Sequence, residues 1–268
     1  MLGRVLWVGL LAGLAAGLAT AVLQHVTTTP LILVAETYET AAPHQHGALP
    51  GHGVAGAVVP SAVLAGRALP DGAVRVAHNH GTPAATATDA SAAPAEADEG
   101  WKPADGWQRT AVTALATVLT SIGWALVLIA GMLIAGDRIT VRNAIGWGAA
   151  AFAATGLATG LGLAPELPGS AAGDLVARQV WWIGTAAASA AGLYGLLRLH
   201  SIGARIGSLI LIAIPHLVGA PHPAKYESTV PAELAAHFAA SSLALTAAMW
   251  MLIACAVGMI WERSAHRA

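Results

Sequence analysis

The sequence predicts an all-α integral membrane protein: a bundle of about six transmembrane helices, with a long external loop after the first. Two observations lead to this fold class. Of the 268 residues, 56% are hydrophobic and only 10% are charged, whereas about 25% charged residues is usual in soluble proteins. The apolar residues also gather in runs long enough to cross a hydrocarbon core, for which about 20 helical residues suffice.

The first predicted span covers residues 2–24, which are almost wholly apolar, with Arg4 near their start. A cleaved signal peptide is the competing interpretation, but the apolar core of such a peptide has only about 7 to 15 residues, so a retained helix is favoured. Residues 30–39 form a short apolar segment that ends in carboxylates. We expect them to be an interfacial or re-entrant extension, so that residues 1–39 make one unit.

Residues 40–107 are rich in Ala, Gly, Pro, Thr and acidic residues and lack a sustained helical or strand period, which predicts a flexible external loop. This loop contains histidines at alternate or loose spacing. Residues i and i+2 of an extended chain point the same way, so weak ion capture is one interpretation and a merely polar loop is the other. The histidines are His44, His46, His52, His78 and His80.

Five further spans are expected within residues 108–262, and their apolar runs contain no Asp, Glu, Lys or Arg. The fifth span of the chain is the awkward one, because the 14 helical residues of its run rise only about 21 Å. Pro215 interrupts that run, so we expect a short, proline-broken crossing. The five runs are residues 110–135, 144–163, 180–197, 206–219 and 238–260.

Two residue types report on packing and anchoring of these spans. Glycines recur every four residues at Gly9, Gly13 and Gly17, which lets a neighbouring helix approach closely. Tryptophans lie mostly at the ends of the runs, as is typical of interfacial anchors, and we assign them no chemistry. They are Trp7, Trp107, Trp147, Trp181, Trp182 and Trp261.

The arginines sort to one side of the membrane if there are six spans. Short cytoplasmic loops collect Arg and Lys, and with five spans the last pair of arginines would be external. We therefore expect six crossings of a bacterial cytoplasmic membrane, both termini in the cytoplasm and residues 263–268 as a cytoplasmic tail. The same topology places most histidines outside, together with every acidic residue except Asp137 and Glu262. The sorted arginines are Arg4, Arg138, Arg142, Arg198, Arg205, Arg263 and Arg267.

The outer face thus combines imidazoles with carboxylates, a ligand mixture suited to transition metals. His216 gives the strongest signal, because it follows Pro215 and broken helices at membrane depth line cavities or ion sites. It is also the one strongly titratable side chain inside a predicted span, and such groups are functional candidates. A histidine hydrogen-bonded between helices is the alternative.

Other candidate ligands surround this position. His222 lies between two prolines, and Glu233 and His237 are four residues apart at the start of the last span, on one helical face. An incidental loop residue is the alternative for His222, and a carboxylate that complements the helix N-terminus is the alternative for Glu233. The full set of candidate metal ligands is His216, His222, His237, Glu233, Glu166, Glu36 and His25.

Several classes of function are disfavoured. Cys255 is the single cysteine, so no two-cysteine metal motif exists, and no phosphate-binding loop is present. The net charge of −1 and the lack of a basic arm give no indication of nucleic acid binding. No nucleophile, base and orienting group occur together, so we expect neither an enzyme nor a permanently bound cofactor. The expected partners are the lipid bilayer, other membrane chains and small ions.

Five phrases in order resemble the CbtA-type family of predicted cobalt transporter subunits. They cover essentially the whole chain outside residues 40–100. The resemblance implies a membrane protein of Co²⁺ uptake linked to cobalamin synthesis, with a small single-span, histidine-containing subunit as partner. The phrases are PLILVAETYE (residues 30–39), PELPG (165–169), RQVWW (178–182), IPHLVGAP (214–221) and VPAELAAHF (230–238).

The resulting hypothesis is a transition-metal uptake subunit that collects Co²⁺ on its outer face and passes it through the helix bundle. The ligand types do not separate Co²⁺ from Ni²⁺ or Zn²⁺, so a transporter of another ion is one alternative. A membrane subunit that binds metal or assembles a partner without transporting is the other. The absence of carboxylates within the predicted spans disfavours a proton-coupled exchanger built on Asp or Glu.

Overall fold

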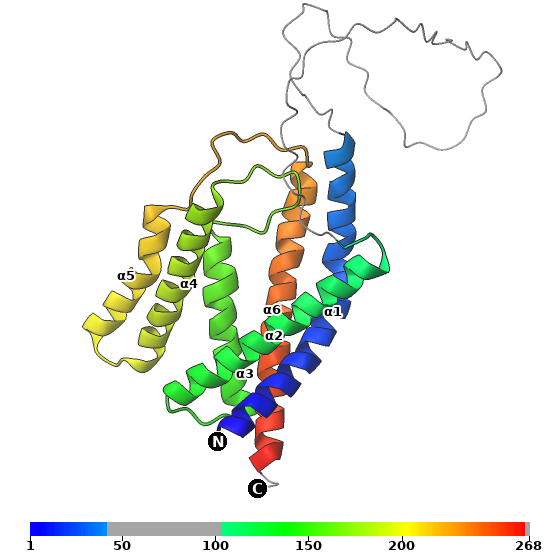
Figure 1. The fold of residues 1–268 in the computed structure, drawn as a ribbon. Coiled ribbons are helices and arrows are strands. Elements are labelled where there is room, and N and C mark those ends of the chain that lie inside the picture. The colour runs from blue at the N-terminus through cyan, green and yellow to red at the C-terminus, as the bar shows by residue number, and fades with distance from the viewer. Residues whose placement is uncertain (42–102, 266–268) are drawn as a thin grey trace, which may run out of the picture. The chain divides into compact units, whose positions relative to one another are not determined.

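The structure, a computed structural model, describes residues 1–41 and 103–265, and these ranges are all-helical (Figure 1). This confirms the all-α class for the described part of the chain. The five loop histidines from His44 to His80 and residues 266–268 lie outside the described ranges. The helices are α1 (Leu2–Ala41), α2 (Trp107–Ile134), α3 (Val141–Phe152) with the π-helical segment η1 (Ala153–Ala158), α4 (Leu175–Arg198), α5 (Ile202–Val218) and α6 (Ala232–Ala265).

Four of these helices, α1, α2, α4 and α6, are long and apolar enough to cross a membrane, and α5 is a shorter apolar helix. The segment formed by α3 and η1 runs without interruption through residues 141–160, which corresponds to a length of about 30 Å. Large apolar side chains such as Trp7, Leu119 and Ile183 are exposed on the surfaces of these helices. A bilayer would cover such a surface, whereas water would not.

Residues 30–39 do not form the re-entrant segment that was one of the two expectations, because α1 continues as one helix through Pro30 to Ala41. The other expectation, an interfacial extension of the first span, stays a prediction. The 40 residues of α1 make a rod of about 60 Å. Even at a tilt of about 40°, the upper end of the usual range, such a rod extends over about 46 Å, so its last turns project beyond the hydrocarbon core.

Helix α5 is short as expected, but Pro215 does not break it. The helix continues to Val218 and ends at Gly219, whose φ of 85° few residues other than glycine adopt. Pro215 lies in the last turn of the helix. It therefore removes only one backbone hydrogen bond, and the helix ends before a kink at the proline could change its course. Its own carbonyl accepts hydrogen bonds from the Gly219 N–H and from Trp181 Nε1, both at 3.1 Å.

The glycine stripe on α1 provides the close approach that its spacing predicts. A Cβ at Gly13 would lie 2.3 Å from the Cα of Ile122, and one at Gly17 would lie 2.7 Å from the Cα of Val118, so α1 and α2 cross with their backbones nearly touching. The main core forms beside this crossing, where α1, α2, α3 and α6 meet around Trp250 and Ile129. Without a hydrophobic drive between helices in lipid, such close packing is what holds them together.

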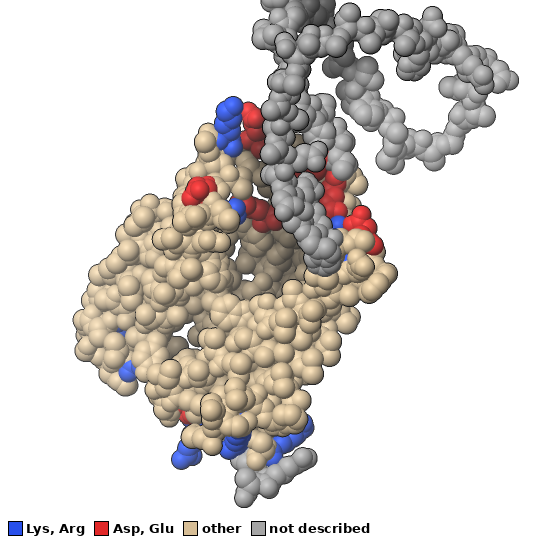
Figure 2. All heavy atoms as spheres, viewed as in Figure 1, with Lys and Arg blue, Asp and Glu red and all other residues tan. Residues whose placement is uncertain are grey.

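Arginines collect at one end of the helices, which we call the arginine-rich end (Figure 2). Arg4 at the start of α1 donates to Ser264 Oγ at 2.8 Å near the end of α6, so the start of α1 and the end of α6 lie side by side. Glu262 accepts from the Val141 N–H at 3.0 Å, and Asp137 is bonded to Arg198. The predicted grouping of these loops is therefore present, and the side of the membrane on which they lie stays a prediction.

The opposite end of the helices, which we call the acidic end, carries a second small core. Ala35 of α1, Leu167 of the turn after η1, and Val230 and Phe238 around the start of α6 pack together there. Each of these segments belongs to a different phrase of the resemblance, and each carries a carboxylate within three residues of a buried one. The carboxylates are Glu36, Glu166 and Glu233.

The first prediction concerns the α1–α2 crossing. Gly13→Ala should lower the free energy of unfolding by about 1 to 3 kcal/mol, because the added methyl would overlap the Ile122 backbone. Thermal unfolding in detergent measures this. Gly123→Ala on α2 is the control, since a Cβ there meets nothing within 4 Å. Equal melting temperatures of the two variants would contradict a close backbone contact at Gly13.

The second prediction concerns Asp137, which lies in the turn after α2 outside the spanning segments. The hydrogen bond from Trp147 Nε1 at 2.7 Å, and then that from Arg198, hold the pKa of this carboxyl below its ordinary value. Because the pKa of Asp137 is lower in the folded protein than in the unfolded chain, its ionised form stabilises the fold at any pH above the unfolded value of about 4. This stabilisation is lost as the pH falls from that value through the pKa of the folded protein. Asp137→Asn should therefore lower the melting temperature at pH 7 by an amount that shrinks below about pH 4.

Melting curves of both proteins between pH 7 and pH 3 test this. The matched control is Asp105→Asn, because the Asp105 side chain is 96% exposed and reaches Arg109 only at 3.6 Å. We expect this control to melt like the unaltered protein throughout. A difference for Asp137→Asn that grows on acidification would have the wrong sign for the arrangement described.

Candidate functional site

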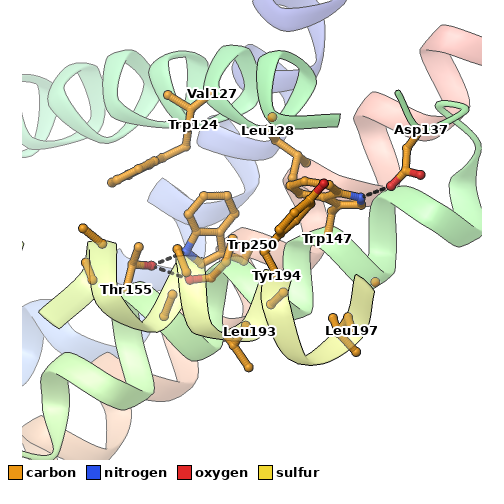
Figure 3. A pocket seen from close by; sticks show the side chains of 18 of the residues that line it. Trp124, Val127, Leu128, Asp137, Trp147, Thr155, Leu193, Tyr194, Leu197 and Trp250 are labelled. Carbon is orange, nitrogen blue, oxygen red and sulfur yellow. Dashed lines mark hydrogen bonds between the residues drawn. The ribbon is translucent and has the colours of Figure 1, made fainter. Parts of the chain in front are cut away.

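A cavity of about 760 Å³ lies between α2, α3, α4 and α6 and extends to the arginine-rich end (Figure 3). Most of its wall is apolar, with alanines of α3 and α4 on two sides. Its charged lining residues are Asp137, Arg142 and Arg198, all from loops or helix ends at the arginine-rich end. We call it the arginine-end cavity.

A second cavity of about 750 Å³ lies between η1, α4 and α6 and extends to the acidic end. At its charged margin Arg178 donates to Glu166 at 2.5 Å. The Nε of Arg178 is buried and makes no hydrogen bond, so the guanidinium is incompletely satisfied. The hydroxyls of Thr159 and Thr246 add polar groups to the wall. We call it the acidic-end cavity.

The two cavities share one wall, which we call the aromatic neck. Its residues line both cavities and come from four segments: Trp124 of α2, Thr155 of η1, Trp182 and Ile183 of α4, and Trp250 of α6. The rings of Trp124 and Trp250 meet at a centroid distance of 5.1 Å, tilted by 52°, a common geometry for aromatic pairs. Figure 3 shows this pair beside Thr155.

The π-helical turn η1 positions the hydroxyl of Thr155 in this neck. A π-helical turn contains one more residue than an α-helical turn and often marks a functional position. Thr155 Oγ1 donates to the Ala151 carbonyl at 2.8 Å, and Thr159 Oγ1 donates to the Thr155 carbonyl at 2.7 Å. The same Thr155 hydroxyl accepts from Trp250 Nε1 at 3.1 Å. Thr155 thereby ties the buried indole of α6 to the distorted turn.

The structure places His216 between helices. Its ring contacts that of Trp181 edge-on, with the centroids 6.0 Å apart. His216 is half-buried and lines neither cavity. One turn before Trp181 on α4 lies Arg178, the partner of Glu166, so His216 is linked to the margin of the acidic-end cavity through one face of α4.

The other predicted ligands are dispersed. Glu36 forms a bidentate pair with Arg109, in which Nη1 donates at 2.9 Å. Of the predicted ligands within the described residues, Glu166 alone lines either of these two cavities. Within residues 1–41 and 103–265 no group of three His, Cys, Asp or Glu side chains lies close enough to hold a metal ion, so the predicted ligand set stays a prediction. The exposed members are His25, Glu166, His222, Glu233 and His237.

Sequence reasoning missed the aromatic neck. Trp182 was expected to be only an interfacial anchor. Trp124 and Trp250 lie in the middle of apolar runs, and no role was predicted for them. In contrast, the 59% exposure of Trp7 and the 78% exposure of Trp107 fit the anchoring role. A tryptophan far from either end of a span is the signal that could have pointed to the neck, since interfacial anchoring does not explain it.

Comparisons with known proteins agree with the resemblance of the five phrases. No curated protein and no solved structure matches the chain. The family model described as "Probable cobalt transporter subunit (CbtA)" matches residues 2–262, nearly the whole length. Four helices of the described residues are long and apolar enough to cross a membrane, as expected of a membrane subunit. The chain belongs to the CbtA family of probable cobalt transporter subunits.

Proposed function

We propose that this protein is the membrane subunit of a Co²⁺ uptake system linked to cobalamin synthesis in a bacterial cytoplasmic membrane. The observation that carries the proposal is the pair of cavities, which enter the bundle from its two ends and share one wall. Both cavities are partly open at the side, where lining residues such as Ile183 are exposed, yet a protein that only anchored a partner would not need two hollows that reach from opposite ends to one shared wall. Membership of a transporter-subunit family supports the same conclusion.

The distribution of charge supports import. Short loops rich in arginine face the cytoplasm, so the arginine-rich end is the inner one in this proposal and the acidic end is the outer one. Carboxylates and imidazoles are then available where an ion arrives. The Co²⁺ ion is the cargo and binds transiently, without a resident cofactor.

Capture begins, in this proposal, at the acidic end. His216, His222, His237, Glu166 and Glu233 supply the nitrogen and oxygen ligands that Co²⁺ accepts, assisted by the external loop and by Glu36 and His25. Because Glu36 and Glu166 are paired with arginines, they act in capture by exchanging an arginine for the ion. The exposed side chains of His222, Glu233 and His237 provide the first contacts.

A second candidate function is a subunit that binds metal or assembles a complex without transporting. The lack of a three-residue ligand group in the described residues favours it, because the missing ligands would then come from a partner. A small single-span, histidine-containing chain is the partner that the family resemblance implies. Transport of Ni²⁺ or Zn²⁺ is the nearest variation of the first function, since the same ligands bind these ions.

The third prediction tests His216. His216→Phe keeps a ring against Trp181 but removes both nitrogens, and it should reduce Co²⁺ accumulation by cells about tenfold or more, as losing a metal-binding interaction typically does. His200→Ala is the control, because His200 is exposed at the opposite end of the α4–α5 pair. Unchanged accumulation in the His216→Phe variant would remove His216 from the capture site.

The fourth prediction separates the two functions. Purified protein in liposomes loaded with a Co²⁺-sensitive dye should admit Co²⁺ on its own, and Ni²⁺ or Zn²⁺ added in excess should compete in proportion to their affinities. A flux seen only when the single-span partner is added would favour the assembly function. Entry of Ni²⁺ or Zn²⁺ in preference to Co²⁺ would reassign the cargo.

A further inference from the structure

The aromatic neck is a wall of uncharged groups between two cavities of nearly equal size. Three indoles, one isoleucine side chain and one hydroxyl make up the surface that both cavities touch. Charged lining residues occur only towards the outer margins, at Glu166 and Arg178 on one side and at Asp137, Arg142 and Arg198 on the other. An ion that crosses the bundle along the cavities must therefore pass a section without a charged partner.

Trp250 is the fixed part of this neck. Its side chain is 2% exposed and belongs to the main core, and its indole N–H is held by Thr155 Oγ1 at 3.1 Å. Trp124 opposes it from α2, half-buried and without such an anchor in the described hydrogen bonds. The ring of Trp124 is thus the part that moves most readily, because its loss of contact leaves no buried donor unpaired.

The π-helical turn controls the fixed part. Thr155 lies within η1, between Ala154 and Gly156, and its neighbours in the turn are small. A π-helical turn holds an extra residue relative to the α-helix on either side and is a recurrent site of local rearrangement. A change in this turn would move the hydroxyl that holds Trp250.

We propose that the two cavities are the outer and inner halves of one translocation pathway and that the aromatic neck is the barrier between them, held closed by the Thr155–Trp250 hydrogen bond and by contact between the rings of Trp124 and Trp250. This inference rests on the proposed function for the identity of the cargo. The observation that supports the barrier is the shared lining of the two cavities.

The neck passes the ion with its inner shell of water. A bare dication in an apolar section would lose its hydration without gaining ligands, which is a large penalty. Six water molecules occupy about 180 Å³ at about 30 Å³ each, which fits within either cavity of about 750 Å³. Indole faces attract a cation without stripping its water, so selection of the ion belongs to the acidic end and control of passage belongs to the neck.

Sided labelling of single cysteines tests the barrier without any use of cobalt. In a Cys255→Ser background, Ala186→Cys reports on the arginine-end cavity and Leu243→Cys on the acidic-end cavity, because each residue lines only one of them. A membrane-impermeant thiol reagent is added to vesicles of known orientation. We expect Ala186→Cys to react only from the arginine-rich side and Leu243→Cys only from the acidic side.

Opening the neck should abolish this sidedness. Trp124→Ala removes the mobile ring, and Thr155→Val keeps the shape of the side chain but removes the hydroxyl that holds Trp250. In either variant Ala186→Cys should gain labelling from the acidic side. The controls are Trp7→Ala, at an exposed tryptophan of α1, and Thr246→Val, whose hydroxyl bonds only within its own helix to the Ser242 carbonyl; both should keep the sidedness.

Two outcomes would overturn the barrier. The first is labelling of Ala186→Cys from both sides in the background protein. The second is unchanged sidedness in Trp124→Ala and Thr155→Val when both variants still melt like the background protein.

The proposed function is tested by a different result. In one case the variants lose sidedness as expected while the protein admits no Co²⁺ into liposomes, with or without its partner. That result would support the neck as a barrier and reject Co²⁺ transport. Co²⁺ flux together with unaltered sidedness in the variants would support Co²⁺ transport and reject the neck as a barrier.

Discussion

Inside a bilayer a backbone carbonyl that a helix leaves free has no water to bond with, and this constraint governs the irregular parts of the bundle. The π-helical turn disturbs the hydrogen-bond ladder, and the hydroxyls of Thr155 and Thr159 donate to carbonyls one turn back. Near the end of α5, Trp181 donates to the Pro215 carbonyl, which also accepts from the Gly219 N–H. The π-helical turn and the end of α5 are thus each tied to a side chain of a neighbouring turn or helix, and in both cases that side chain lies beside a candidate functional group.

The same constraint explains what the sequence could and could not predict. Apolar runs, sorted arginines and the Gly9, Gly13 and Gly17 stripe depend on local composition and spacing, and the helices and the α1–α2 crossing follow from them. Composition and spacing do not predict that α1 continues through Pro30 and α5 through Pro215. A proline in lipid is tolerated wherever neighbouring groups satisfy the backbone. The period of an apolar run carries no information about such neighbours.

The candidate site was predictable only in part for a related reason. Glu36 and Glu166 were identified as ligands from their places in short motifs, yet their arginine partners are Arg109 and Arg178, which no local pattern connects with them. The neck joins Trp124, Thr155, Trp182 and Trp250 from four segments, and their meeting depends on how the helices cross. An arrangement of this kind is a property of packing rather than of spacing along the chain.

If the protein carries Co²⁺ along the proposed pathway, the separation of charged ends from an uncharged middle has a consequence for that transport. A ligand set strong enough to select Co²⁺ in the middle of the bundle would also hold the ion there, since tight binding in a deep site slows release. Placing the carboxylates and imidazoles at the acidic end lets capture be selective while the ion is still in contact with water. The neck then needs only to separate the two halves of the path, and for that task ring contacts and one hydrogen bond to a π-helical turn are sufficient. At the far margin of the arginine-end cavity, Arg198 is paired with Asp137, and this carboxylate lowers the barrier that the guanidinium would otherwise present to a cation leaving along the proposed path.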